Sequence, residues 1–132
     1  MNSTTEMETF MTEQTPIVMN ATDQLVVVWT SQDREVAMNM VFMYTKNSKR
    51  KGWWKNVRLV IWGPSAKLMS VDPELQAELE ELKTAGVELL ACKACADRYG
   101  VSEKLSGMGI DVVYMGLPLT QYLKGECTVI TI

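Results

Sequence analysis

The sequence predicts one α/β domain, built as a three-layer αβα sandwich around a five-stranded, mostly parallel sheet. Three observations lead to this prediction. Short runs of β-prone apolar residues recur along the chain and are typical of strands buried on both faces. Segments with helical periodicity separate these runs. No internal repeat divides the 132 residues, a length that suits a single domain.

The first strand is predicted at residues 25–29 (LVVVW). The polar residues 1–22 before it are expected to form a flexible tail, which leaves 23–132 as the domain. A helix is predicted over 35–44, with apolar side chains around much of its circumference. Such a helix is expected to be deeply buried or covered by a second subunit. The basic, Trp-containing residues 46–58 are predicted to form a loop.

The second strand is predicted at residues 57–62 (VRLVIW), followed by a glycine-proline turn. A helix should begin after Asp72, a good N-cap, and end at Gly86, where a left-handed residue is favoured. Residues 87–91 (VELLA) are predicted as the third strand.

The C-terminal part repeats this alternation. A short helix and a further turn are expected after the third strand, then a strand at 110–115 (IDVVYM), a helix within 116–125 and a last strand at 127–132 (CTVITI). Right-handed crossovers would connect these strands, so the predicted architecture is of the flavodoxin-like type.

Composition narrows the possible functions. The net charge is −3 and the pI about 5.0, which argues against a nucleic-acid partner. No apolar run approaches the roughly 20 residues of a membrane span, and the polar N-terminus lacks the features of a secretory signal. Three cysteines fit a reducing compartment better than a disulfide scaffold. We therefore expect a cytoplasmic protein without a membrane partner.

The chain contains no histidine. This excludes Ser-His-Asp and Cys-His catalysis, as well as zinc sites with imidazole ligands. A nucleophilic thiol would need another means of activation. We predict no cofactor and no metal site.

In a parallel sheet, ligands gather beyond the carboxyl ends of the strands. Cys92 follows the third strand and is the predicted centre of the site. Cys127 begins the last strand and is expected at the opposite edge. The candidate binding residues are those that follow the strand ends: Ser31, Gly63, Pro64, Ser65 and Gly116.

Cys92 and Cys95 form a C-x-x-C pair at a strand-to-helix junction. The helix start and the positive charge of Lys93 would favour a Cys92 thiolate. Structural zinc needs about four ligands, which one pair does not supply. A dithiol–disulfide couple, a sulfur-accepting thiol and two structural cysteines remain open from the residues alone.

The stretch CKACADRYG, residues 92–100, resembles a motif of the DsrE/DsrF-like family: a cysteine, small residues, a basic residue and a glycine. The stretches VVWTSQDRE, LVIWGPSAKLM and GVSEKLSGMGIDVVYMG are also similar to segments of that family. Cys92 falls on the family's sulfur-accepting cysteine, and Arg98 and Gly100 match the motif. Cys95 stands where relatives usually have alanine.

The resemblance implies a DsrE-like fold, assembly as a homotrimer or homohexamer, and a persulfide-transfer role with Cys92 as sulfur acceptor. Such a protein would work with sulfur donor and acceptor proteins and could act as a sulfurtransferase. Cys95 would be a resolving or modulating thiol. Two alternatives stay open: an oligomeric accessory protein that binds a small ligand or partner without catalysis, and a Cys92–Cys95 redox protein.

Overall fold

Five strands form one sheet in the order β4-β3-β2-β1-β5, and every neighbouring pair is parallel. The computed structural model describes residues 23–132, so the predicted tail, residues 1–22, lies outside the described residues. The prediction of a five-stranded α/β sandwich is confirmed. The strands are β1 Gln24–Trp29, β2 Asn56–Ile61, β3 Glu88–Cys92, β4 Asp111–Val113 and β5 Thr128–Thr131.

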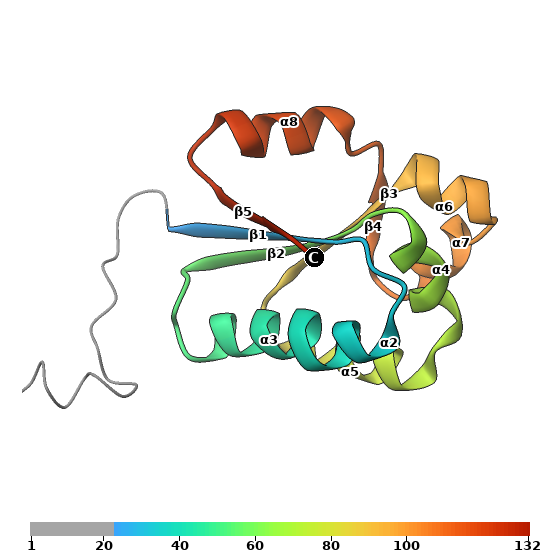
Figure 1. Ribbon diagram of the computed structural model, residues 1–132, viewed down its shortest axis with the longest axis horizontal. Coiled ribbons are helices and arrows are strands. Elements are labelled where there is room, and N and C mark those ends of the chain that lie inside the picture. Colours follow the sequence, from blue (N-terminus) through green and yellow to red (C-terminus); the bar gives the residue numbers. More distant parts are fainter. Residues whose placement is uncertain (1–22) are drawn as a thin grey trace, which may run out of the picture.

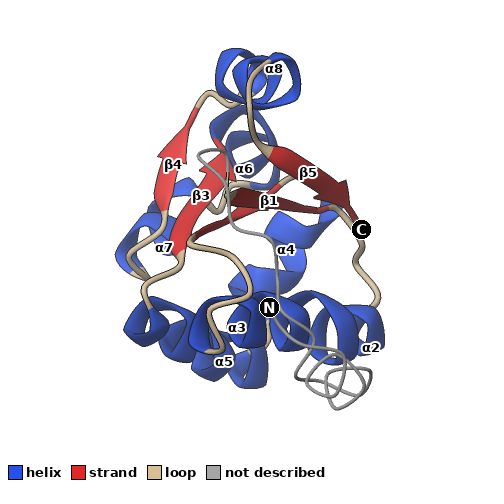
Figure 2. Cartoon of the chain, turned by 90° about the vertical axis from the view of Figure 1, so that its left-hand side faces the viewer, coloured by secondary structure: helices blue, strands red, loops and turns tan. Residues whose placement is uncertain are grey.

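Helices cover both faces of the sheet. Figure 1 shows α8 on one side and α2, α3 and α5 on the other, and Figure 2 shows the same three layers after a quarter turn. Within the described residues no helix is long and apolar enough to cross a bilayer. The helices are α2 Arg34–Val36, η2 Ala37–Phe42, α3 Met43–Arg50, α4 Pro64–Val71, α5 Pro73–Ala85, α6 Lys93–Tyr99, α7 Ser102–Gly107 and α8 Gly116–Lys124.

The first helical region is longer than predicted. It runs without a break from α2 through the π-helical η2 to the end of α3, so the loop predicted from residue 46 begins only after Arg50. Thr45 and Ser48 are fully buried polar residues, and they interrupt the apolar pattern that would have marked this part of the helix. Lys46 contributes to the packing by reaching Glu78 of α5 at 3.0 Å.

Two other elements differ from the prediction by more than one residue. A helix, α4, begins directly at Pro64, where a turn was expected, and Gly63 precedes it with a left-handed φ of 74°. Proline suits the first helical position because it has no N–H to satisfy there. The strand predicted at residues 110–115 is shortened to Asp111–Val113, the β4 edge strand of the sheet.

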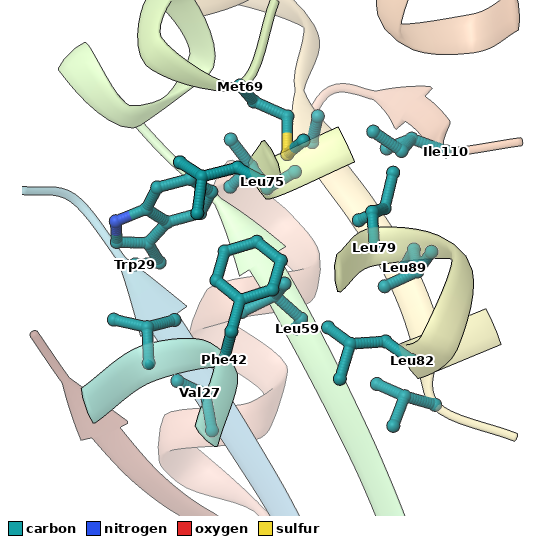
Figure 3. Packing of buried hydrophobic residues seen from close by; sticks show 14 of the residues in the cluster. Val27, Trp29, Phe42, Leu59, Met69, Leu75, Leu79, Leu82, Leu89 and Ile110 are labelled. Carbon is teal, nitrogen blue, oxygen red and sulfur yellow. The ribbon is translucent and has the colours of Figure 1, made fainter. Parts of the chain in front are cut away.

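The two faces of the sheet bury different amounts of apolar surface. The larger core lies under α2, α3 and α5, and it includes Trp29 and Phe42, whose rings meet edge-to-face at 5.2 Å (Figure 3). The smaller core consists of Val26, Val28, Val60, Leu90, Cys92 and Met115, with Leu119 and Tyr122 of α8 packed against it. Cys92 is therefore part of a hydrophobic core.

Helix α5 starts and ends at the predicted residues. The Asp72 carboxylate accepts hydrogen bonds from the backbone N–H groups of Glu74 and Leu75, each at 3.0 Å, and Gly86 ends the helix with a φ of 94°. Asp72 also pairs with Arg34 Nε at 2.7 Å. One side chain thus caps α5 and connects it to α2.

Replacing Asp72 with alanine should lower the free energy of unfolding by about 1–2 kcal/mol, since an N-cap is worth roughly 1 kcal/mol and the ion pair is only partly exposed. Urea unfolding followed by circular dichroism measures this loss. The control Asp111→Ala, at an exposed position on β4, should change stability by less than about 0.5 kcal/mol. Equal losses in the two variants would contradict the capping role.

Candidate functional site

Cys92 and Cys95 meet where β3 joins α6. Cys92 is the last residue of β3, with extended backbone angles, and it also stands at the N-cap position of α6. Cys95 lies three residues further on, which places the two side chains on the same side of the first helical turn. Both thiols are free, and the Cys95 thiol donates a hydrogen bond to the Cys92 sulfur over a distance of 3.0 Å.

The two thiols differ in their access to solvent. Cys92 is only 4% exposed and belongs to the smaller core, whereas Cys95 is half-buried and lines a cavity of about 440 Å³. This volume lies in the range of sites for small molecules. The cavity is bounded by the start of α4 and by one side of α6, through Gly63, Pro64, Ala94, Cys95, Arg98 and Tyr99.

Arg98 is the cationic side chain of this cavity. It follows Cys95 by three residues on α6, so both side chains lie on the same side of the helix. Among residues 23–132 no carboxylate forms an ion pair with Arg98. An exposed guanidinium beside a thiol suits a substrate that carries negative charge.

Burial raises the pKa of the Cys92 thiol, and the side-chain hydrogen bond with Cys95 and the charge repulsion between the two sulfurs raise it further. The backbone N–H groups of Ala94 and Cys95 act in the opposite direction. The start of α6 therefore lowers the Cys92 pKa, as predicted, but desolvation raises this pKa by more. The prediction of a lowered Cys92 pKa is wrong for this reason.

Lys93 does not provide the charge that was predicted beside Cys92. Its ammonium group pairs with the Asp97 carboxylate at 3.1 Å and lies 5.7 Å from the centre of the Tyr114 ring. The hydrogen bond to Asp97 is the main cause that raises the pKa of Lys93. The side chain is directed along the surface of α6, and its charge is neutralised there.

The structure brings only part of the predicted binding set to the cavity. Gly63 and Pro64 line it next to Cys95. The Ser65 hydroxyl is buried and donates to the Trp29 carbonyl at 2.5 Å, so it connects the start of α4 to β1. Ser31 accepts a hydrogen bond from the backbone N–H of Asp33 at 3.0 Å, and the exposed Gly116 begins α8.

No role was predicted for Arg98 from the sequence, although Arg98 belongs to the family motif at residues 92–100. Its spacing of three residues from Cys95, on a helix that was predicted, was the available signal. No pattern in the sequence indicated that Tyr99 and the start of α4 line this cavity. A turn, and not a helix, was expected at Pro64.

Cys127 lies at the opposite edge of the sheet, as predicted. Its sulfur is 3.8 Å from Gln24 Oε1, at the amino end of β1, and 4.0 Å from Arg58 Nη1.

Within the part of the chain that the structure describes, no three Cys, Asp or Glu side chains gather in a way that would hold a metal ion.

The fold and the thiol pair define a class of protein: a parallel α/β sandwich with a dithiol at the carboxyl edge of its sheet. A family model confirms the resemblance found in the sequence. The chain belongs to the DsrE/DsrF-like family, whose model matches residues 24–132. No curated protein matches the chain.

Solved structures agree with this assignment. A conserved protein of unknown function, BT1422 from Bacteroides thetaiotaomicron, is 39% identical, with a TM-score of 0.83 over 87% of this chain and 99% of its own. The ychN protein from E. coli is 17% identical, with a TM-score of 0.64 over 83% of this chain and 99% of its own. MTH1491 from Methanobacterium thermoautotrophicum is 19% identical, with a TM-score of 0.65 over 83% and 98%. The last two similarities concern the fold.

Iodoacetamide near neutral pH should alkylate Cys95 before Cys92. The raised pKa keeps Cys92 as the unreactive thiol at neutral pH, and burial restricts access. In Cys95→Ser, which leaves Cys92 without a thiol neighbour, the Cys92 rate should reach half its maximum above about pH 8.5, the ordinary thiol pKa. Peptide mass spectrometry across a pH series measures both rates. A Cys92 profile centred at or below about pH 8.5 contradicts the effect of burial.

Proposed function

We propose that this protein carries sulfane sulfur as a cysteine persulfide on the Cys92–Cys95 pair, with Cys92 as the residue that holds it. The observation that carries the proposal is the 3.0 Å separation of two free sulfurs at the carboxyl edge of the sheet. Membership of the DsrE/DsrF-like family supports a role of the sulfur-relay type. A protein that accepts the sulfur would be its partner.

The position of Cys92 suits the holding role. Its sulfur lies among apolar side chains of the smaller core, where water and dissolved thiols have little access. A persulfide reacts readily with other thiols, so enclosure would protect it until an acceptor arrives. A buried, mostly protonated thiol is a poor first nucleophile, but a partner sulfur at 3.0 Å compensates through proximity.

The same distance favours a second candidate function, dithiol–disulfide exchange between Cys92 and Cys95. A disulfide bond measures about 2.05 Å, so the sulfurs would need to approach by roughly 1 Å.

A purely ligand-binding accessory role agrees with the raised Cys92 pKa. The half-buried Cys95 thiol beside a cavity argues for chemistry instead.

Incubation of the reduced protein with a low-molecular-weight persulfide should add one sulfur atom to its intact mass, and dithiothreitol should remove it. In Cys92→Ala any added sulfur lies on the half-buried Cys95, so dithiothreitol should remove it faster than from the wild type, in which buried Cys92 holds it. The matched control Cys127→Ala removes a half-buried cysteine from the other edge and should load like the wild type. Loss of two hydrogens without added sulfur would support the disulfide function, and an unchanged mass would support ligand binding alone.

We also propose that the protein assembles with copies of itself as a homotrimer or homohexamer. Three apolar side chains near the start of α8 support such contacts: Val113, Tyr114 and Leu117 are 40%, 66% and 68% exposed. Burying them against a second copy would remove apolar surface from water.

The assembly predicts a light-scattering mass of three or six chains for the wild type. Leu117→Glu should shift the protein toward smaller species, because the new charge would be desolvated at the interface. The control Gln121→Glu adds a charge at an exposed position on the same helix and should leave the mass unchanged. A monomeric wild type would contradict this assembly.

A further inference from the structure

We infer that Cys95 is the thiol that meets the sulfur donor, and that the donor is a small anionic sulfane-sulfur compound held beside Arg98. Sulfur then passes from Cys95 to Cys92. This inference rests on the proposed persulfide function and assigns its entry point and substrate class.

Access determines which thiol reacts first. A thiolate attacks a sulfur–sulfur bond by direct contact, so the donor must reach the attacking sulfur. Cys92 is 4% exposed and surrounded by the smaller core, whereas Cys95 faces the cavity between α4 and α6. A donor in this cavity meets Cys95, and the Cys92 sulfur lies 3.0 Å behind it.

The charges around the cavity favour an anionic donor. Arg98 lines the cavity and has no ion-pair partner within the described residues, in contrast to Lys93, which Asp97 neutralises. The N-terminus of α4, which begins at Pro64 in the cavity wall, adds a weaker positive potential. The volume of about 440 Å³ suits a small molecule. A persulfide that bears a carboxylate and inorganic thiosulfate share this chemistry.

The two steps balance without an added oxidant. The Cys95 thiolate attacks the outer sulfur of the donor R–S–SH, the donor S–S bond breaks, and R–S⁻ leaves and takes up the proton that Cys95 lost. The Cys92 thiolate then attacks the outer sulfur of Cys95–S–SH. A new S–S bond forms on Cys92, and Cys95 leaves as a thiolate that recovers a proton. With thiosulfate the leaving group of the first step is sulfite.

Rapid-quench loading with cysteine persulfide, followed by alkylation and trypsin digestion, tests the order. Cleavage after Lys93 separates the two cysteines onto different peptides. In the wild type, labelled sulfur should appear on Cys95 first and on Cys92 later. Cys95→Ser should load Cys92 about tenfold more slowly or worse, equivalent to roughly 1.4 kcal/mol in activation free energy. Cys92→Ala should keep the sulfur on Cys95, with no later transfer to a second peptide.

Two outcomes overturn the inference while leaving the proposed function intact: Cys92 loading before Cys95, or Cys95→Ser loading Cys92 at the wild-type rate. Uptake by none of the proteins contradicts the proposed function itself. Cys127→Ala controls for the loss of a cysteine, and circular dichroism checks that each variant is folded.

The donor class is tested with Arg98→Gln. The concentration of cysteine persulfide or thiosulfate that gives half the maximal rate should rise about tenfold or more, and the rate with an alkyl persulfide that lacks a carboxylate should fall much less. Arg98→Lys keeps a positive charge and should therefore lower this concentration part of the way back to the wild-type value. Lys104→Gln, which removes an exposed charge on α7 outside the cavity, is the matched control. Equal losses with these two donors and with the alkyl persulfide overturn the role of Arg98, and loading by only one of the two, cysteine persulfide or thiosulfate, identifies the source.

Discussion

The parallel pairing of β1, β2 and β3 is the constraint on which the rest of the structure depends. These strands are buried on both faces, and parallel neighbours need a crossover for every connection. All crossovers therefore leave from the same edge. The Ser65 hydroxyl strengthens this edge by connecting the start of α4 to the Trp29 carbonyl at the end of β1. The start of α4 and the start of α6 thus come together, and the cavity lies between them.

The same constraint gives the two thiols different access to solvent. Side chains alternate along β3, so Cys92 follows Leu90 toward the smaller core under α8. Helical geometry then brings Cys95 back over it, at a position with access to solvent. Burial raises the Cys92 pKa more than the helix start lowers it. A strand end that joins a helix does not by itself produce a reactive thiolate, because the depth at which the strand ends decides the balance.

The effect of each positive charge on the candidate site also depends on which side chains surround it. Lys93 and Arg98 lie on one short helix, and in the sequence Lys93 is the obvious partner for Cys92. In the structure Asp97 neutralises Lys93, while Arg98 lies in the cavity wall. Helical spacing explains both results, since Lys93 and Asp97 are four residues apart and Cys95 and Arg98 three. The chemistry of the site therefore follows from which face of α6 each charge occupies.

The sequence by itself determined the alternation of strands and helices, the caps at Asp72 and Gly86, the carboxyl edge as the place of the candidate site, and the family. These features depend on local patterns of apolar, capping and turn residues. It could not reveal the helix that continues through the buried Thr45 and Ser48, the helix that begins at Pro64, or the burial of Cys92 relative to Cys95. Only the tertiary structure decided these features, because desolvation and access depend on which distant segments cover a residue.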